Sequence, residues 1–235
     1  MERGRVAAFG WFMTTRSPLL AIEGHTFDPR LVPPGSWALD GGCRGFALAR
    51  FLAARGVNVL AVDADPDVRD PGIDGVTFVP AALLAARDVP PDGVATLFRF
   101  HDNPEAHTTR WGPPATGVRV PARTLADLMR AHAVRRFALV KLDVEGGEYG
   151  LLEELGAADP PLADQISVEY HDFCHMSPTP DDPERWHALN LARLSRHYRA
   201  ARHAKQPAPW GPPGAACYLD CLYVAKPWWP DGGRP

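Results

Sequence analysis

Short apolar runs alternate with segments of helical periodicity along most of this chain. The runs are bounded by Gly, Pro, Asp or Ser, as is typical of buried strands between turns. The run 137–143 is strongly apolar and indicates a central parallel strand. Strands are expected at residues 36–39, 57–62, 76–79, 95–100, 118–120, 137–143, 165–170 and 218–225.

Helices are expected in most of the intervals between these strands, at residues 46–55, 125–132, 148–155 and 183–198. Thr124 is a good N-cap, Pro183 suits a first helical turn, and Gly56 and Gly156 are expected to end their helices. Alternating strands and helices predict an α/β fold with a doubly wound, Rossmann-like sheet. We expect the sheet to be mostly parallel, with an antiparallel C-terminal strand.

Other stretches show no clear period. Residues 1–35 form a preface in which 27–32 is expected to be a short turn or helix beneath the sheet. A turn or helix is expected from residue 65 and another at 81–86, and residues 101–111 form a polar loop that carries histidines. The length allows two domains, but a single domain over 1–235 is the simpler prediction.

A glycine-rich turn follows the first expected strand, in Trp37-Ala38-Leu39-Asp40-Gly41-Gly42-Cys43-Arg44-Gly45. The next strand ends at Asp63, so the segment resembles the first half of a nucleotide-binding βαβ unit. A dinucleotide fingerprint would place glycines at positions 40, 42 and 45, but position 40 is an acid. This carboxylate would repel a pyrophosphate and suits a cationic ligand such as S-adenosylmethionine, which carries an ammonium and a sulfonium.

The candidate cofactor-binding residues lie at the ends of the first three strands. Asp63 stands where a carboxylate usually accepts both ribose hydroxyls. Glycine at 41 and 42 permits close backbone approach, and Gly45 permits close packing of the helix. The full set is Asp40, Gly41, Gly42, Cys43, Gly45, Asp63, Ala64 and Ala81. The alternative is a tight strand-to-helix turn that binds nothing.

A second acidic cluster follows the apolar run 137–143. Asp143, Glu145 and Glu148 lie within six residues in Lys141-Leu142-Asp143-Val144-Glu145-Gly146-Gly147-Glu148. The carboxyl end of a strand in an open α/β sheet is where ligands bind. Glu148 would lie in the first turn of a helix, near the positive end of its dipole. The alternative is that Asp143 and Glu148 only cap backbone N–H groups.

These motifs together resemble the FkbM-type methyltransferases, a family of class I S-adenosylmethionine-dependent enzymes. The resemblance rests on the first turn, "TLADLM", "ALVKLDVEGGE" and "QISVEYH", and it covers residues 36–172. It implies a methyltransferase sheet and methyl transfer, commonly to a hydroxyl of a sugar or natural product. The sequence departs from the family where Gly42-Cys43-Arg44 replaces a small residue and Asn. Residues 172–213 would then form an insertion or lid on the acceptor side.

The candidate catalytic residues are His171, Asp143 and Glu145. His171 is the first candidate base, because an imidazole with a pKa of about 6.5 suits proton removal from a hydroxyl. Asp143 is the second candidate and would orient the acceptor or the methyl group. A divalent metal, Mg²⁺ or Mn²⁺, is an option, with Asp143, Glu148 and Glu169 as candidate ligands and Glu145 and His171 nearby.

Other histidines and the cysteines give weaker signals. His25, His101 and His107 are expected in loops and could line an acceptor pocket, whereas His187, His197 and His203 are expected to face solvent. Cys43, Cys174, Cys217 and Cys221 form no metal-ligand pattern, so free thiols in a reducing cytosol are expected. No signal peptide or apolar membrane span is visible, and we expect a cytoplasmic protein that does not bind membranes.

The composition limits the alternatives. A net charge of −3 gives no basic surface for a nucleic acid, so a small-molecule acceptor is expected, and a homodimer would be compatible. A nicotinamide-dependent oxidoreductase is disfavoured by Asp40 and by the lack of a Tyr-x-x-x-Lys set. A non-catalytic binding module is the third class, although Gly42, Asp63 and Asp143 are all intact. Methylation of nitrogen or of a peptide stays open.

Overall fold

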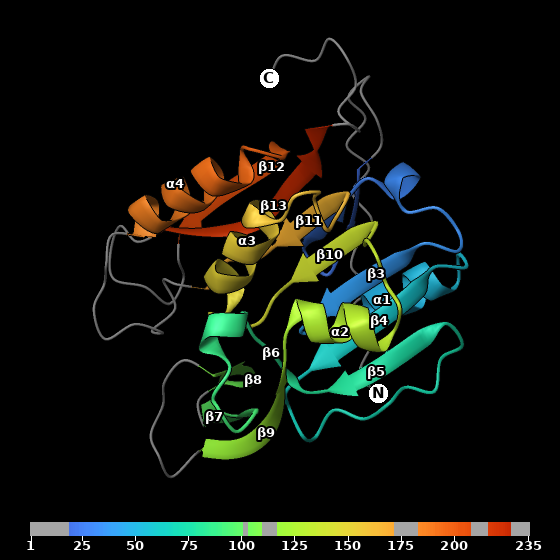
Figure 1. The fold of residues 1–235 in the computed structure, drawn as a ribbon, viewed down its shortest axis with the longest axis vertical. Coiled ribbons are helices and arrows are strands. Elements are labelled where there is room, and N and C mark those ends of the chain that lie inside the picture. Colours follow the sequence, from blue (N-terminus) through green and yellow to red (C-terminus); the bar gives the residue numbers. More distant parts are fainter. Residues whose placement is uncertain (1–18, 101–102, 110–116, 172–182, 208–215, 227–235) are drawn as a thin grey trace, which may run out of the picture.

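A seven-stranded sheet forms the centre of the computed structural model, which describes residues 19–100, 103–109, 117–171, 183–207 and 216–226. Its strand order is β12-β13-β11-β10-β3-β4-β5 (Figure 1). The strands from β5 to β11 pair in parallel, and β13 and β12 are antiparallel. Their bounds are β3 Trp37–Gly41, β4 Asn58–Asp63, β5 Val76–Pro80, β10 Leu139–Leu142, β11 Gln165–Val168, β12 Tyr198–Pro207 and β13 Ala216–Ala225. The predicted fold class is therefore confirmed.

Helices cover both faces of this sheet. Helix α1 (Ala47–Ala53) packs on one face, where Leu48 and Leu52 join a core with β3 and β4. Helices α2 (Leu125–Ala131), α3 (Glu148–Ala157) and α4 (Pro183–Leu194) lie over the other face (Figure 1). Apart from Trp37, which is partly buried, the apolar side chains of β3, β4 and β10 are almost fully buried, which explains their apolar runs.

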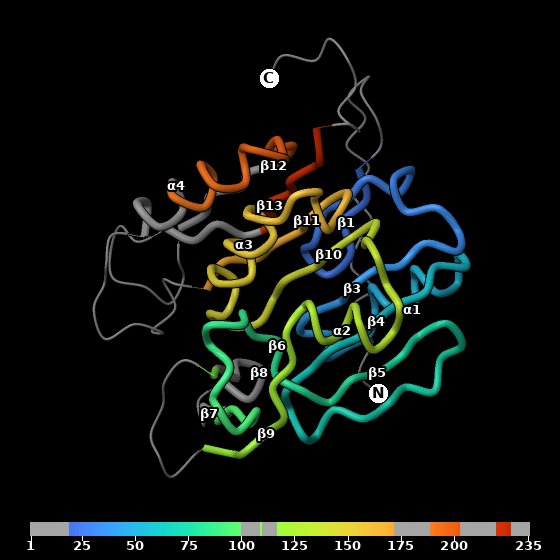
Figure 2. Tube along the Cα trace, viewed as in Figure 1, coloured from blue at the N-terminus to red at the C-terminus, as the bar shows by residue number. Residues whose placement is uncertain are grey.

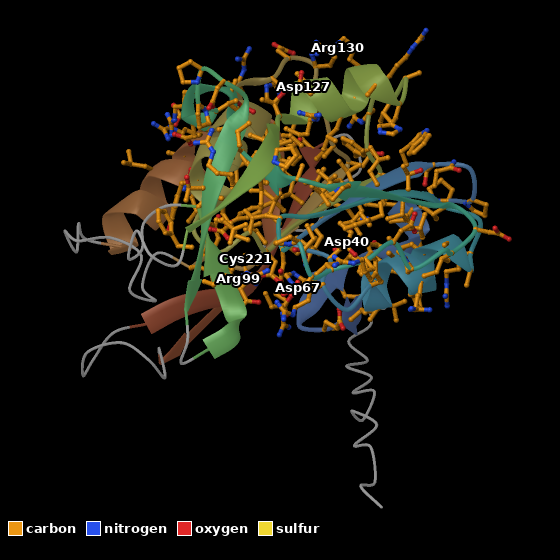
Figure 3. All side chains as sticks on the ribbon, turned by 90° about the horizontal axis from the view of Figure 1, so that it is seen from below. Asp40, Asp67, Arg99, Asp127, Arg130 and Cys221 are labelled. Atoms are coloured by element: carbon orange, nitrogen blue, oxygen red, sulfur yellow. The ribbon has the colours of Figure 1, made fainter. Side chains whose placement is uncertain are left out.

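Local sequence explains the start of helix α2, whereas tertiary packing explains a glycine near the end of helix α3. Thr124 and Asp127 form a capping box at the start of α2, as the sequence predicts, and Asp127 also pairs with Arg130 on the outer side of the helix (Figure 3). Gly156 does not end α3, so that prediction is wrong. A Cβ there would lie 3.2 Å from the Arg193 carbonyl, so this glycine permits the close approach of α4.

The order in which strands are added to the sheet changes side after β5. It runs from β3 outward to β4 and β5, and later returns to add β10 on the other side of β3. The carboxyl ends of β3 and β10 therefore border a crevice between two diverging connections. Such a switch point is where open α/β sheets bind their ligands.

A second, four-stranded sheet lies beyond the carboxyl ends of β4 and β5, with the order β6-β9-β7-β8 (Figure 1). It contains β6 Ala82–Leu83, β7 Val94–Phe100, β8 Asn103–Thr108 and β9 Gly117–Arg123. Two predictions were wrong here. Residues 81–86 hold a short strand that pairs with β9, and most of the expected polar loop 101–111 is strand β8. Pairing across the sheet overrode weak local patterns.

An N-terminal hairpin was missed in the preface. Strands β1 (Leu20–Ile22) and β2 (His25–Phe27) pair antiparallel, and the hairpin lies beside β11 (Figure 2). The Thr26 hydroxyl and backbone N–H both donate to the Asp220 carboxylate at 2.7 Å. The expected short helix is confirmed at Pro29–Leu31.

Three further expectations concern the C-terminal part and the cysteines. Strand β12 was not predicted, because residues 198–207 were assigned to the expected helix and insertion. The proposed lid 172–213 contains α4 and β12, and residues 172–182 and 208–215 lie outside the described residues. Cys43 and Cys221 are buried free thiols, as expected. Within the described part of the chain, each helix is too short or too polar to span a membrane.

Gly42 gives the first testable prediction. Its φ is +75°, and a Cβ would lie 1.8 Å from the Asp143 carbonyl oxygen, so alanine is excluded both by conformation and by space. We expect Gly42→Ala to lower the free energy of unfolding by more than about 3 kcal/mol in urea titrations. Gly35→Ala is the matched control, since Gly35 has a φ of +79° with open space around it. It should cost only about 1–2 kcal/mol, and equal losses would show that the close approach is unimportant.

Candidate active site

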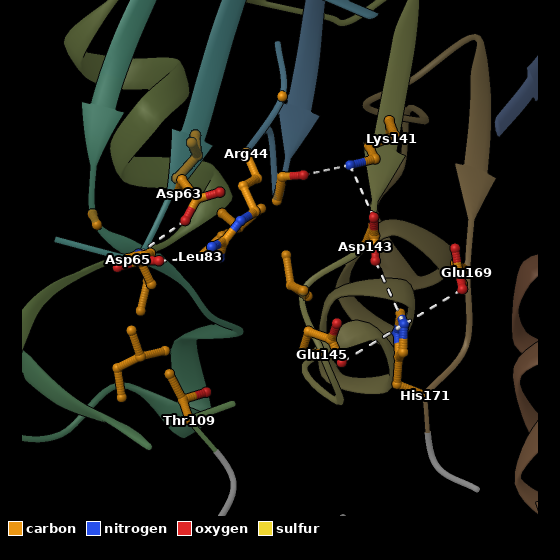
Figure 4. Close-up of a pocket in the computed structure, with 18 of the residues that line it drawn as sticks. Arg44, Asp63, Asp65, Leu83, Thr109, Lys141, Asp143, Glu145, Glu169 and His171 are labelled. Atoms are coloured by element: carbon orange, nitrogen blue, oxygen red, sulfur yellow. Dashed lines mark hydrogen bonds and ion pairs between the residues drawn. The ribbon is translucent and has the colours of Figure 1, made fainter. Parts of the chain in front are cut away.

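A cleft of about 550 Å³ opens at the carboxyl ends of the central strands (Figure 4). The glycine-rich turn, the ends of β4 and β10, the second sheet and the N-terminal hairpin all contribute to its walls. The lining residues are Glu23, His25, Gly42, Arg44, Gly45, Val62, Asp63, Ala64, Asp65, Ala81, Ala82, Leu83, Leu97, Thr109, Lys141, Asp143, Val144, Glu145, Glu169 and His171.

Five of the candidate cofactor-binding residues line this cleft: Gly42, Gly45, Asp63, Ala64 and Ala81. Asp63 ends β4, and its Oδ1 accepts the backbone N–H of Asp65 at 2.8 Å. Burial raises the pKa of the Asp63 carboxyl, although the bond from Asp65 partly offsets this. The carboxylate is thus fixed at the cleft wall, where a ligand's hydroxyl groups could reach it.

The other three candidates lie behind the wall. Asp40 is buried, and its Oδ1 is 3.4 Å from the Lys141 ammonium, so it does not face a ligand directly. Cys43 packs in the core under α1, and burial raises the pKa of its thiol far above the usual range. Gly41 lies within the sheet, where a Cβ would meet Leu83 at 3.0 Å.

Lys141 joins the two acidic segments of the sequence. Its ammonium lies 3.4 Å from Asp40 Oδ1 and 3.3 Å from Asp143 Oδ2, and it donates to the Gly42 carbonyl at 2.6 Å. Burial alone would lower the pKa of Lys141, but the charges of Asp40 and Asp143 raise it overall. The residue therefore stays charged and connects β3, its turn and β10.

An ion-pair cluster around Asp65, at the end of the cleft nearest β4, was not predicted. Asp65 is buried, with Arg44 Nη1 at 3.1 Å and Arg99 Nη2 at 2.6 Å from its two oxygens. Arg99 also reaches Asp67 at 3.1 Å, and Figure 3 shows these two side chains close together. The cluster fastens the glycine-rich turn and the second sheet to the end of β4. The sequence signal was an acid two residues after Asp63, which was interpreted only as the start of a turn.

The candidate catalytic residues converge at the end of the cleft nearest β10 and β11, which we call the acceptor end (Figure 4). His171 Nε2 lies 3.5 Å from Asp143 Oδ1, 3.8 Å from Glu145 Oε2 and 3.6 Å from Glu169 Oε1. Glu145 has a φ of +53°, a sparsely populated conformation for a non-glycine residue. The structure thus brings together the two motifs that the sequence separates by over 20 positions.

Glu148 has a different position from the other acids of its motif. It is fully buried and accepts the backbone N–H groups of Val144 and Gly146 at 3.0 Å. Its Oε1 also lies 3.1 Å from His171 Nδ1. The capping alternative therefore holds for Glu148, and it does not line the cleft as a metal ligand would.

His25 belongs to the acceptor end, although the sequence suggested a loop histidine. It lies in β2, is only 2% exposed, and its Nε2 is 3.4 Å from Asp143 Oδ2 and 4.0 Å from Glu169 Oε2. No local pattern indicates this position, because it depends on the hairpin's long-range contact with β11 and β13.

The acceptor end holds more carboxylates than cations, and the pKa values reflect this. Burial raises the pKa of Glu145 to about 7, with smaller contributions of opposite sign from His171 and Asp143. Burial also raises the pKa of Glu169. The pKa of Asp143 is lowered because Lys141 and the two histidines outweigh the effect of burial. Burial would lower the pKa of His171, but its bond to Glu148 and the surrounding carboxylates raise it well above the usual range.

These values change one expectation. A histidine with a strongly raised pKa keeps its proton at neutral pH, so His171 in this charge state is an N–H donor and not the free base expected from an unperturbed imidazole. Glu145, with its raised pKa, exchanges a proton near neutral pH. The acceptor end can therefore bind and release protons and cations.

The match to a family model decides which protein family this chain belongs to. The model of the methyltransferase FkbM domain matches residues 42–189, which is more than half of the chain. This chain belongs to the FkbM methyltransferase family. The match confirms the resemblance drawn from the sequence and the enzyme class, an S-adenosylmethionine-dependent methyltransferase. A search of curated proteins finds no match.

The solved structures that are similar to this FkbM methyltransferase share little sequence with it. A TehB-like S-adenosylmethionine-dependent methyltransferase from Corynebacterium glutamicum has 15% identity and a TM-score of 0.39, covering 84% of this chain and 86% of its own. Magnesium protoporphyrin IX methyltransferase from Synechocystis, solved with bound S-adenosylhomocysteine, has 13% identity and a TM-score of 0.42, covering 82% and 74%.

Lys141 gives the second testable prediction. Lys141→Met leaves the buried Asp40 carboxylate without its cation, so the free energy of unfolding at pH 7.5 should fall by about 3–5 kcal/mol in urea titrations. The double variant Lys141→Met with Asp40→Asn removes both charges and should recover part of that loss. A Lys141→Met protein as stable as the wild type would contradict the role assigned to this ion pair.

Proposed function

We propose that this FkbM methyltransferase transfers the methyl group of S-adenosylmethionine to a hydroxyl oxygen of a sugar or other natural-product small molecule. The observation that carries the proposal is a single cleft with two chemically different ends. One end combines a glycine-rich turn with a strand-end carboxylate, and the other combines histidines with carboxylates. The first suits a nucleoside and the second suits a group that must lose a proton.

The donor would lie along the glycine-rich turn. Asp63 is proposed to accept the ribose hydroxyls, and the small side chains of Ala64 and Ala81 leave room for the adenine ring. Asp40 is paired with Lys141, so another acid must face the donor's ammonium. Glu23 lines the cleft beside the turn, where a Cβ on Gly45 would lie 3.0 Å from its Oε1. We assign the ammonium to Glu23.

The charge of the acceptor end favours a hydroxyl over an amine. Carboxylates beside an amine stabilise its ammonium form, in which the lone pair needed for attack is bound to a proton. A hydroxyl is neutral, so neighbouring carboxylates accept its hydrogen bond without blocking its oxygen. Asp143, Glu145 and Glu169 line the cleft at the acceptor end, where such a hydroxyl would bind.

The reaction is an in-line displacement. The acceptor oxygen forms a bond to the methyl carbon, the carbon–sulfur bond breaks, and the sulfonium becomes the thioether of S-adenosylhomocysteine. The hydroxyl proton passes to a carboxylate of the acceptor end. Asp143, Glu145 and His171 are the proposed catalytic residues, which hold the oxygen in line with the methyl group. Such positioning contributes up to roughly 7–11 kcal/mol in ideal cases.

The divalent cation considered from the sequence would act at the acceptor end, but the proposed methyl transfer does not depend on it. Mg²⁺ or Mn²⁺ at the acceptor end would bind the acceptor's oxygen and lower the pKa of its hydroxyl. Glu148 must be removed from the ligand set expected from the sequence, because its carboxylate already accepts hydrogen bonds from backbone N–H groups and contacts His171.

Binding of the donor product tests the first half of this proposal. Isothermal titration of the wild type with S-adenosylhomocysteine should show binding, and Asp63→Ala should weaken it at least tenfold. The expected loss follows from removing hydrogen bonds to a charged group, each worth about 1.5–3 kcal/mol. Asp67→Ala is the matched control, because its carboxylate is 73% exposed and lies outside the cleft lining. A wild type without any binding would refute the donor assignment.

Acceptor preference tests the second half. Release of S-adenosylhomocysteine should be detected with members of a panel of hydroxylated glycosides and not with the corresponding amino sugars or peptides. With a hydroxyl acceptor, His171→Ala should slow turnover by roughly 10²-fold, because the acceptor oxygen loses a group that holds it in line, and should leave S-adenosylhomocysteine affinity nearly unchanged.

Two outcomes would count against the acceptor assignment. Mass spectrometry that places the methyl group on nitrogen would overturn the choice of a hydroxyl. Equal loss of turnover and of S-adenosylhomocysteine affinity in His171→Ala would show that this residue supports the fold of the site and does not act on the acceptor.

A further inference from the structure

Three ligand atoms of the acceptor end surround one point. His171 Nε2 lies 3.5 Å from Asp143 Oδ1 and 3.8 Å from Glu145 Oε2, and all three ligand atoms are within 4.8 Å of one another. These separations exceed ordinary N–H···O hydrogen-bond distances of about 2.7–3.2 Å. They are close to the separation of neighbouring ligands around a metal, roughly 3–3.6 Å for bonds of about 2.0–2.2 Å.

The imidazole of His171 is held in the orientation of a metal ligand. The ring is over nine-tenths buried, and Nδ1 lies 3.1 Å from Glu148 Oε1. Metal-binding histidines usually donate their second ring N–H to a carboxylate or carbonyl in this way. Glu148 is itself fixed by backbone N–H groups of the 144–146 turn. Nε2 is therefore directed at the carboxylates of Asp143 and Glu145.

The charges also call for a cation. The carboxyl groups of Asp40, Asp143, Glu145, Glu148 and Glu169 lie close to three basic groups, which are Lys141, His25 and His171. The carboxyl groups therefore outnumber the basic groups by two. Burying unmatched charge is costly, and one divalent cation would balance it.

We propose that Asp143, Glu145 and His171 bind one hard divalent cation, with Mn²⁺ or Mg²⁺ as the class and Mn²⁺ favoured by the imidazole ligand. Glu169 borders this set of ligands, with its Oε1 3.6 Å from His171 Nε2. The cation replaces the Nε2 proton of His171, so its binding releases a proton. Asp143, Glu145 and His171 all line the cleft, so a cation that they hold would be accessible to the oxygen of a hydroxylated acceptor.

A second grouping, His25 with Asp143 and Glu169, is less suitable. The Lys141 ammonium lies 3.3 Å from Asp143 Oδ2, the oxygen on the His25 side, and would repel a metal there. His25 Nδ1 is buried without a hydrogen-bond partner within the described structure, so no carboxylate or carbonyl orients the ring through its second nitrogen, as Glu148 does for His171. The two groupings make opposite predictions for His25 and His171.

Binding of Mn²⁺ to the full chain tests this inference without an assay of turnover. The protein is stripped with a chelator, dialysed and titrated with MnCl₂ at pH 7.5, and free Mn²⁺ is followed by electron paramagnetic resonance. We expect one ion per chain, and binding at least roughly tenfold weaker in His171→Ala and in Glu145→Gln. His25→Ala is the matched control and should bind Mn²⁺ nearly as well as the wild type. Unchanged melting temperatures of the variants would show that the fold persists.

The role of the cation in methyl transfer rests on the proposed function, but the binding of the cation does not. The possible outcomes therefore test the two proposals separately. Wild-type protein that binds S-adenosylhomocysteine but not Mn²⁺ overturns the cation site and leaves the proposed function intact. Mn²⁺ binding without S-adenosylhomocysteine binding supports the site and overturns the proposed function. Loss of Mn²⁺ in His25→Ala but not in His171→Ala overturns the ligand set.

Discussion

One buried ammonium holds the two halves of the site together. Lys141 lies in the central strand β10, yet its charge is directed at Asp40 of β3, at Asp143 at the end of its own strand and at the Gly42 carbonyl of the first turn. These strands are neighbours at the switch point, where the chain leaves a crevice in the sheet. The ion pair therefore fixes the distance between the donor and acceptor ends, and Gly42 is required because the two turns meet without room for a Cβ.

The acids of the cleft fall into separate roles. Asp40 and Asp65 are buried and matched by cations, and their contacts support the fold of the site. Glu148 holds the turn before α3 and orients His171. Asp63 and Glu145 line the cleft with pKa values that burial raises. The carboxylates of Asp63 and Glu145 lie where a ligand can reach them, whereas Asp40 and Glu148 lie outside the cleft lining.

Much of the sheet and both acidic motifs could be predicted from the sequence, because they depend on local patterns. Apolar runs gave β3, β4 and β10, and the acids directly after them had to lie at one edge of a parallel sheet. His25 could not be predicted in the same way. Its place in the cleft depends on the hairpin's contact with Asp220, which is 194 residues from Thr26 in sequence. The separate roles of Asp143 and Glu148 also needed the structure, since both acids fit a strand-end cluster equally well.

The composition of the acceptor end follows from the strand ends that surround it. β10 supplies Asp143, the next turn supplies Glu145, β11 leads to Glu169 and His171, and the hairpin adds His25. β10 also supplies Lys141, whose ammonium lies 3.3 Å from Asp143 Oδ2 and 3.4 Å from Asp40 Oδ1, so one cation is shared between two carboxylates. A phosphorylated or carboxylated acceptor would be repelled by the other carboxylates, whereas a neutral polyol would meet hydrogen-bond acceptors. The charge pattern is therefore the physical reason why the proposed acceptor is a neutral hydroxyl compound, since an anion would be repelled and an amine would be held in its ammonium form.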